Sequence, residues 1–296
     1  MKFLMPSGTR NSPHPAVLLK FLAMKSDLAR KPLKISASRF VAPLLMLAIA
    51  HAQTCTAQEA QSTPGQVQVP DWALPASSTH TQVPPPAGFH RPTVTFHQPI
   101  GIFQDQSDIG GPLASGSASF NPATKQYTIN SAGYNIWYQR DEFRYLWRKM
   151  SGNVSLAADV DFPNPNGFGD RKVVLVIRQS LDDDSKEAML GEHGAGMIHL
   201  AQRAETGAQM KDLQYRFSGG LNGVHAHRVG IEKRGDQIAI FISLTGEPMH
   251  QFGPPITLHF DAPFYVGIGF CSHQPATVDT ATVSDVLLQN AAGQVQ

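Results

Sequence analysis

Apolar and polar side chains alternate with a period of two through the carboxyl-terminal third of the chain. Short alternating runs bounded by Gly, Pro and Asp are typical of half-buried antiparallel strands. The apolar members that follow the turns at Gly235-Asp236, Pro254-Pro255 and Pro263 are Ile238, Ile240, Ile242, Ile256, Leu258, Phe260, Val266, Ile268 and Phe270. This stretch carries no metal, nucleophile or phosphate motif, so the sequence describes the architecture better than the activity.

The preceding segments continue the strand pattern. Val154–Phe162 alternates in the same way, and the continuous apolar run Val173–Ile177 predicts a strand that is covered on both faces. Helical periodicity is nearly absent, and only Ser180–Ala188 suits a short helical turn. About eleven or twelve such strands indicate an all-β, two-sheet antiparallel sandwich of jelly-roll type, because a single open sheet would leave one apolar face bare.

Composition limits the class of partner. The 296 residues have a net charge of +1 at pH 7, so no bulk field favours nucleic acid or an anionic membrane. The hydrophobic content of 42% is enough for a real core. We therefore expect one large sandwich domain and no nucleic-acid partner.

The amino terminus has the order of a secretory signal peptide. Four basic residues precede the apolar run Phe40–Ala50, which ends at the small-residue site Ala50-His51-Ala52. The run is well short of the roughly 20 residues of a membrane-spanning helix. Residues 1–52 are thus expected to be removed, with Met24 a candidate for the true start. The protein is expected to be secreted or periplasmic.

Residues 53–92 are rich in Pro, Gln and Ser, and we expect them to form a disordered tether to the domain at 93–296. Cys55 lies beside the cleavage site, but Thr54 is a poor fit to the small residue that a lipoprotein site needs, so anchoring is not expected. Cys271, in a predicted core strand, is the only other cysteine, and no disulfide framework is expected.

A series of short segments within residues 105–290 resembles a bacterial family of concanavalin A-like domains. That family is often described as "regulation of enolase" and is also found appended to TolB-like propeller proteins. The order and spacing of the segments carry the resemblance: Tyr134–Trp137, Asp141–Leu146, Val174–Arg178, Leu213–Arg216, Tyr265–His273 and Ala281–Val286.

The resemblance implies a concanavalin A-like jelly roll that is usually extracytoplasmic and has no settled biochemical activity. One turn departs from the family pattern: Glu192-His193-Gly194-Ala195-Gly196 stands where a His-Gly-Asp-Gly turn is expected. The missing carboxylate puts any metal or acid role of that turn in doubt.

Paired carboxylates raise the alternative of a glycoside hydrolase, which needs two acids about 5 to 9 Å apart. Asp159 and Asp161 are two residues apart on a predicted strand, so they share a face at roughly 6 to 7 Å. Glucanases of this fold carry glutamates in a Glu-x-Asp-x-Glu pattern, which Ala157–Asp161 lacks. A solvated strand face is the competing interpretation.

Metal ligands are scattered. His225-Ala226-His227 resembles half of a zinc site with no third ligand assigned, and His193, His199 and His273 are further candidates of unassigned role. Asp182-Asp183-Asp184 could hold a structural calcium but lacks calcium-loop spacing and also suits a turn. We therefore predict no metal site and no cofactor.

Aromatic and basic residues crowd one hairpin, where Trp137, Tyr138, Tyr145 and Trp147 accompany three arginines. Aromatic faces stack on sugar rings, but they also pack cores. Trp147 suits the core, and Trp137-Tyr138 suits an exposed pair.

The sequence favours a non-catalytic binding module for carbohydrate or an envelope component. The expected lining residues on a concave sheet are Trp137, Tyr138, Arg178, His193, Arg216 and His273. The alternatives are a glycan hydrolase acting through Asp159 and Asp161, and a protein-interaction domain without a small ligand.

Overall fold

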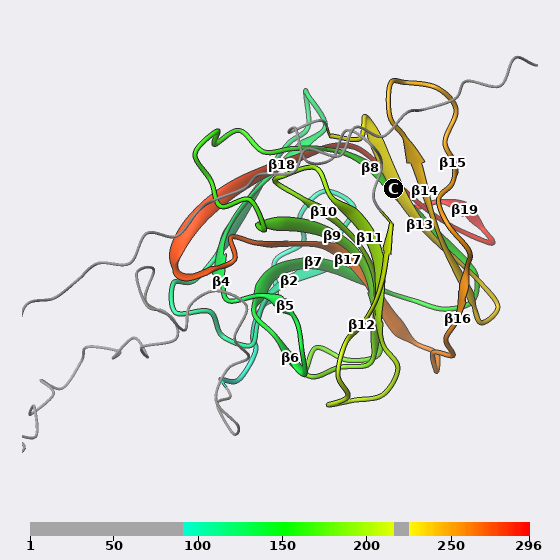
Figure 1. The fold of residues 1–296 in the computed structure, drawn as a ribbon, viewed down its shortest axis with the longest axis horizontal. Helices are drawn as coiled ribbons and strands as arrows, with labels where there is room; N and C mark the ends of the chain where they lie inside the picture. Colours follow the sequence, from blue (N-terminus) through cyan, green and yellow to red (C-terminus); the bar gives the residue numbers. More distant parts are fainter. Residues whose placement is uncertain (1–90, 216–224) are drawn as a thin grey trace, which may run out of the picture. The chain divides into compact units, whose positions relative to one another are not determined.

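The computed structural model describes residues 91–215 and 225–296 as two antiparallel sheets packed face to face, with a separate small hairpin (Figure 1). The expected signal peptide, nearly all of the expected tether, Cys55 and Arg216 lie outside the described residues. Every described strand pairing is antiparallel. Among the described residues, no helix is long and apolar enough to span a membrane.

The first sheet has eight strands. In spatial order they are β1 (Val94–Phe96), β2 (Asp105–Ile109), β7 (Phe143–Met150), β17 (Phe264–Cys271), β9 (Lys172–Arg178), β10 (Glu187–His193), β11 (Ile198–Arg203) and β12 (Lys211–Tyr215). Three of these pairings, β2 with β7, β7 with β17 and β17 with β9, join distant parts of the chain, so the sheet is complete only when the whole domain folds.

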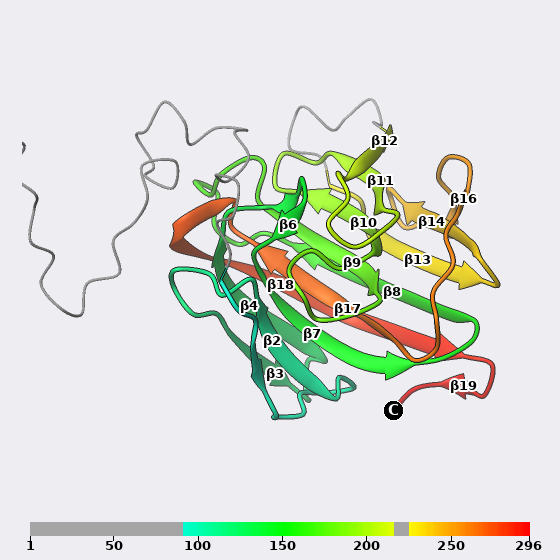
Figure 2. The same ribbon diagram turned by 90° about the horizontal axis from the view of Figure 1, so that it is seen from below.

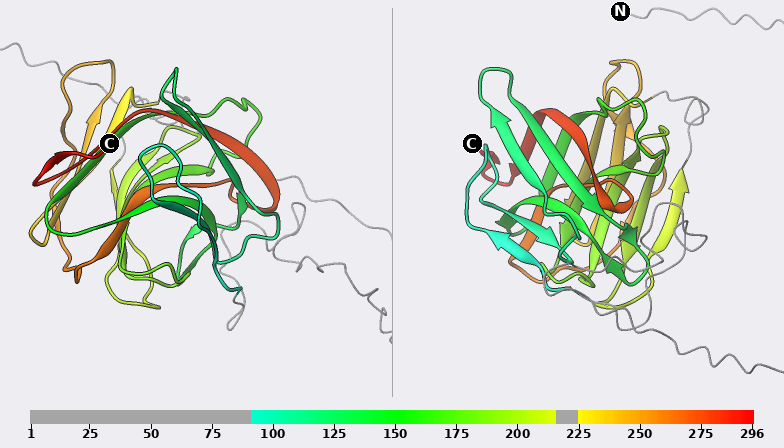
Figure 3. Two further views of the ribbon diagram at one scale, coloured as in Figure 1. Left: turned by 180° about the vertical axis from the view of Figure 1, so that it is seen from behind. Right: turned by 90° about the vertical axis from the view of Figure 1, so that its left-hand side faces the viewer.

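The second sheet has nine strands. Its main path is β15 (His250–Gln251), β14 (Gln237–Ser243), β13 (Arg228–Arg234), β8 (Val154–Asp161), β18 (Gln274–Asn290), β4 (Gln126–Gly133) and β3 (Ser117–Asn121). Two short strands join it at the side, β16 (Ile256–Thr257) beside β14 and β19 (Gly293–Gln294) beside β18. The long, curved β18 runs the length of this layer (Figures 2 and 3).

The core between the sheets follows the predicted alternation. In β9, Val173, Leu175 and Ile177 belong to the apolar cluster between the two sheets. Val174 and Val176 belong to a second cluster on the opposite face of the first sheet. The prediction of a strand covered on both faces is therefore confirmed, and so is the burial of Cys271. The short helical turn expected at Ser180–Ala188 is wrong: the segment turns and then enters β10 at Glu187.

The second cluster is covered by the hairpin of β5 (Ile136–Trp137) and β6 (Arg140–Asp141). The first sheet curls around this face, which we call the concave face (Figure 1). The arrangement is an all-β sandwich of two antiparallel sheets of jelly-roll type, as the strand pattern predicted.

Candidate functional site

The middle of the concave face is filled by the protein's own side chains. Phe143, Tyr145 and Trp147 of β7 are buried there, and Met189 and Met210 pack with them. Trp147 is a core residue, as its pattern suggested, and its indole Nε1 donates to Ser107 Oγ at 2.9 Å. Charged side chains gather at the two ends of strands β9, β10 and β11 on this face, and the two ends have a different character.

One end carries a buried ion quartet, which we define as Asp141, Arg178, Glu187 and Arg203. All four side chains have 0% exposure. Arg178 and Arg203 each donate to the Asp141 carboxylate at 2.7 Å, and Arg178 also pairs with Glu187. Burial opposes ionisation of Asp141, but the two guanidiniums outweigh it and lower its pKa.

The quartet fastens the β5–β6 hairpin to the sheet, because Asp141 belongs to the hairpin and its partners belong to β9, β10 and β11. Arg178 was expected to line a ligand site. Its guanidinium instead contacts Asp141, Glu187 and the carbonyl of Asp182. We therefore assign Arg178 to the scaffold that positions the hairpin.

The other end of β9, β10 and β11 carries what we call the histidine cluster: Lys172, His193, His199, Asp170 and Asp212. The Nε2 atoms of His193 and His199 are 3.3 Å apart. His199 Nδ1 lies 3.0 Å from Asp212 Oδ1, and His193 Nδ1 lies 3.7 Å from Asp170 Oδ1. The imidazoles are buried, whereas the side chains of Asp170 and Asp212 are 42% and 30% exposed.

The histidines of this cluster are held in the neutral form. Burial lowers the pKa of His193 and of His199, and the nearby Lys172 ammonium acts in the same direction. Lys172 is itself buried, which lowers its pKa. Its interaction with His193 brings the pKa of Asp170 to about 2, so that carboxyl is ionised at neutral pH.

Trp137 lies over this cluster. Its indole stacks on His199, with ring centroids 5.5 Å apart and planes 24° apart, and Lys172 Nζ is 5.2 Å from its centroid. Both contacts come from the first sheet beneath the hairpin. The indole nevertheless stays partly exposed. Trp137 and His193, two of the predicted site residues, are thus brought together through His199.

Tyr138 and His273 form a separate aromatic row. The Tyr134 ring is 6.5 Å from Tyr138 and 6.4 Å from His273, whose other neighbour is Phe168 at 5.1 Å. His273 is only 3% exposed, whereas Tyr138 is half-buried. These two predicted residues therefore lie near each other but contribute buried packing more than open surface.

Asp159 and Asp161 lie on β8 of the second sheet. They alternate with the buried Ala158 and Val160, so they share the outward face of that sheet. Asp159 accepts a hydrogen bond from Arg228 Nη1 at 2.5 Å. The arrangement is that of a partly exposed ion pair on an outward sheet face, which fits the solvated-face interpretation better than a catalytic pair.

His225 and His227 flank the buried Ala226. His225 Nδ1 lies 3.4 Å from Oε1 of the fully buried Glu192, while His227 is exposed. Within residues 91–215 and 225–296, no group of three His, Cys, Asp or Glu side chains is placed to hold a metal. Asp183 of the acidic run pairs with Arg140 at 2.9 Å, and Ser185 N donates to Asp182 O in a turn.

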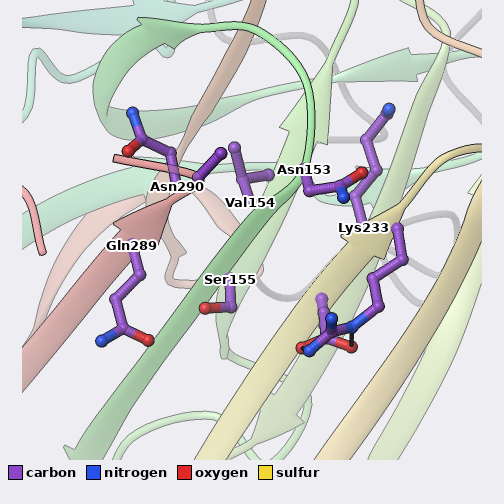
Figure 4. A pocket seen from close by; sticks show the side chains of 9 residues that line it. Asn153, Val154, Ser155, Lys233, Gln289 and Asn290 are labelled. Atoms are coloured by element: carbon purple, nitrogen blue, oxygen red, sulfur yellow. Dashed lines mark hydrogen bonds and ion pairs between the residues drawn. The ribbon is translucent and has the colours of Figure 1, made fainter. Parts of the chain in front are cut away.

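A polar hollow of about 210 Å³ lies on the second sheet, between the ends of β8, β13 and β18 (Figure 4). Asn153, Ser155 and Gln289 line it together with Lys233. The Lys233 ammonium already donates to Gly235 O at 2.7 Å, and Arg234 is paired with Glu232. The charged groups that line the hollow are thus paired with neighbouring protein atoms, so we do not favour the hollow as a ligand site.

No protein-family model and no curated protein matches the chain, so the family named from its segments stays a prediction. The structure is similar to a functionally unknown protein from Saccharomyces cerevisiae, with 14% identity, a TM-score of 0.47, and coverage of 60% of this chain and 93% of that chain.

Two further similar structures are sugar-binding proteins. Carbohydrate-binding module CBM66 from Bacillus subtilis has 11% identity and a TM-score of 0.39, over 68% of this chain and 97% of that chain. A Bauhinia forficata lectin in complex with GalNAc has 5% identity and a TM-score of 0.38, over 66% and 96%. Such likenesses concern the fold alone, and the site rests on the residues of this chain.

Proposed function

We propose that this protein is a non-catalytic binding module that holds carbohydrate at the Trp137 edge of the concave face. The observation that carries the proposal is the partly exposed indole, backed by His199 and bordered by the cluster that includes Asp170 and Asp212. An aromatic face suits the C–H face of a sugar ring, and ionised carboxylates accept hydrogen bonds from its hydroxyls.

The filled middle of the concave face supports a shallow platform. Phe143, Tyr145 and Trp147 occupy the space where a deep groove for a sugar chain would run. A carbohydrate bound at the Trp137 edge would therefore contact the protein through one or two of its sugar units. A glycan hydrolase receives less support, because Asp159 is bound by Arg228 on the other sheet.

The same filled face supports a second candidate, a protein-interaction domain without a small ligand. Under that proposal, the hairpin and its Trp137 side chain would contact a partner protein or another envelope component. The two candidates share one surface, and a screen for sugar binding separates them.

The test is a glycan array with the full chain, its Trp137→Ala variant and a Tyr265→Ala control. Tyr265 is a half-buried aromatic at the quartet end of the same sheet, where it packs edge-on against Trp147. We expect binding that falls about tenfold or more in Trp137→Ala, the loss typical of an aromatic anchor, and that persists in Tyr265→Ala. No binding by the folded wild type would overturn the carbohydrate proposal and leave protein interaction.

We also propose that the protein is exported, with cleavage after Ala52. The support is the order of basic residues, apolar run and Ala-His-Ala site. Mass spectrometry of protein recovered from outside the cytoplasm should show a chain that begins at Gln53. A chain that retains residues 1–52 and stays in the cytoplasm would contradict export.

A further inference from the structure

The two imidazoles of the histidine cluster converge on each other in an unusual way. His193 Nε2 faces His199 Nε2 at 3.3 Å, while each Nδ1 faces a carboxylate of Asp170 or Asp212. Sequence spacing alone assigns these histidines no shared role. The contact with Asp212 fixes which ring nitrogen of His199 carries the proton.

An ionised carboxylate can only accept a hydrogen bond, so His199 Nδ1 must donate to Asp212 Oδ1 at 3.0 Å. Neutral His199 then has a lone pair on Nε2. His193 Nδ1 lies 3.7 Å from Asp170 Oδ1, which is too far for a hydrogen bond, so this contact does not fix the His193 tautomer. The Nε2 lone pair of His199 faces His193 Nε2, which can either donate its own N–H to it or share a bound cation with it.

A bound metal ion suits this arrangement, because a metal forms coordinate bonds with neutral imidazole. Asp170 and Asp212 bring two carboxylates to the cluster, which offset the two charges of a divalent ion and leave Lys172 as one net positive charge.

The distances match a known geometry. Two imidazole nitrogens bound to one tetrahedral zinc lie about 3.3 Å apart, because each Zn–N bond is about 2.0–2.1 Å long. Metal-bound histidines usually donate their second ring N–H to a carboxylate, which fixes the tautomer and the orientation of the ring. Asp212 occupies that position behind His199 at 3.0 Å, and Asp170 lies on the same side of His193 at the longer distance of 3.7 Å.

The backbone makes room for this pairing at Gly191. A Cβ atom at that position would lie 2.4 Å from His199 Nε2, so only glycine lets the ring lie across β10. Gly191 pairs with His199 in the ladder between β10 and β11. The ring position is therefore set by the strand register, the glycine, Asp212 and Trp137 together.

We propose that His193 Nε2 and His199 Nε2 bind a divalent zinc ion, with Asp212 and Asp170 orienting the two ligands. The protein supplies two ligands among its described residues, so the remaining coordination positions are open to water or to ligand atoms that arrive at the Trp137 edge. The inference does not depend on carbohydrate binding.

Calorimetric titration of the metal-free full chain with Zn²⁺ tests the site, and Co²⁺ absorption spectra report the coordination geometry. We expect that His193→Ala and His199→Ala each remove one equivalent of zinc and the tetrahedral cobalt spectrum. The control is His259→Ala, which alters an exposed histidine that also contacts two carboxylates, Asp236 and Asp261. It should keep that equivalent.

The positioning role of Asp212 is tested separately. Asp212→Asn keeps both imidazoles and should weaken zinc binding about 10- to 100-fold. Circular dichroism shows whether each variant is folded, and Asp212→Asn keeps the test valid if an alanine variant is not. Wild type that binds no zinc, or zinc binding equal in all four variants, would overturn the proposal and leave a hydrogen-bonded histidine pair with the proton on His193 Nε2.

Discussion

Strands β9, β10 and β11 carry polar side chains at both of their ends, on the same concave face. At one end, the guanidiniums of Arg178 and Arg203 meet the carboxyl groups of Asp141 and Glu187 without any exposure, and burial raises the pKa of Glu187 to about 7. At the other end, His193 and His199 are nearly as buried but neutral, and their partner carboxylates reach solvent. Only apolar residues such as Val176, Met189 and Ala201 separate the two ends.

The two ends therefore differ in role: the quartet supports the hairpin, and the histidine cluster is the candidate binding site. Charges that are fully matched inside a protein fix one geometry, and removing one partner leaves an uncompensated charge. The quartet therefore fixes the hairpin that carries Trp137. Two imidazoles whose Nε2 atoms face each other can bind a further group, which is the property expected of a binding site. Burial alone does not distinguish the two ends, whereas the pairing of opposite charges does.

The largest expected effect comes from breaking the quartet. Asp141→Ala leaves two buried guanidiniums with one carboxylate and should cost about 3–5 kcal/mol of unfolding free energy. The measurement is chemical denaturation at neutral pH. The matched control is Asp159→Ala, which breaks a partly exposed Arg–Asp pair whose side chains are 21% and 25% exposed, and which should cost about 1 kcal/mol. Equal costs would show that the quartet is not the main fastening of the hairpin.

Glu142 has a degree of charge pairing between those of the two ends: it is buried, and its one arginine partner is Arg91, whose Nη2 lies 2.7 Å from Glu142 Oε1. Burial raises its pKa from 4.5 to about 7 against the opposing effect of Arg91. The native state therefore holds this proton more tightly than the unfolded state. The resulting stability is present below pH 4.5 and is lost as pH rises through about 7, by at most about 3 kcal/mol.

Glu142→Gln cannot titrate, so the difference in stability between wild type and variant should shift in favour of the variant between pH 4.5 and 7. Thermal unfolding across that range measures the difference. The contributions of other titrating groups, such as Glu187, are the same in both proteins and cancel. A difference that stays constant with pH would mean that the native and unfolded states bind this proton equally.

Gly191→Ala tests the space that the histidine cluster needs. The new Cβ would lie 2.4 Å from His199 Nε2, and that ring is held by Asp212 and Trp137, so overpacking should cost about 1–3 kcal/mol. Gly169→Ala is the control, because its Cβ would meet nothing closer than 3.7 Å. Denaturation midpoints that match between the two variants would show that His199 moves aside freely.

The fold was predictable because a period of two reports directly which face of a strand is buried. In β9 that alternation gave both the core face and the concave face correctly. The alternation places Arg178 on the same side as Val174 and Val176, so the sheet face that carries Arg178 could also be predicted from the sequence. The sequence does not show what lies across the sheet, and the partner that changes the role of Arg178 is Asp141, which arrives on the hairpin.

The histidine cluster was harder to predict for a related reason. His199 stands between Ile198 and Leu200, so its own neighbours indicate an ordinary strand. Its contact with His193 depends on a ladder register that puts Gly191 opposite it, and Asp212 comes from a third strand. A polar residue on the second face of a buried strand, opposite a glycine, is the signal that could have drawn attention to it.

The smallest expected effect comes from the histidine cluster, in contrast to the quartet. Replacing both histidines, in His193→Leu/His199→Leu, removes the two facing polar groups together and keeps similar volume, so metal-free stability should change by less than about 1 kcal/mol. Denaturation in the presence of a chelator measures this. Added zinc should then stabilise the wild type and leave the double variant unchanged, because a ligand stabilises only the state that binds it. A metal-free loss as large as that of Asp141→Ala would make the histidines a second structural fastening, and the two ends of the face would then differ in chemistry but not in role.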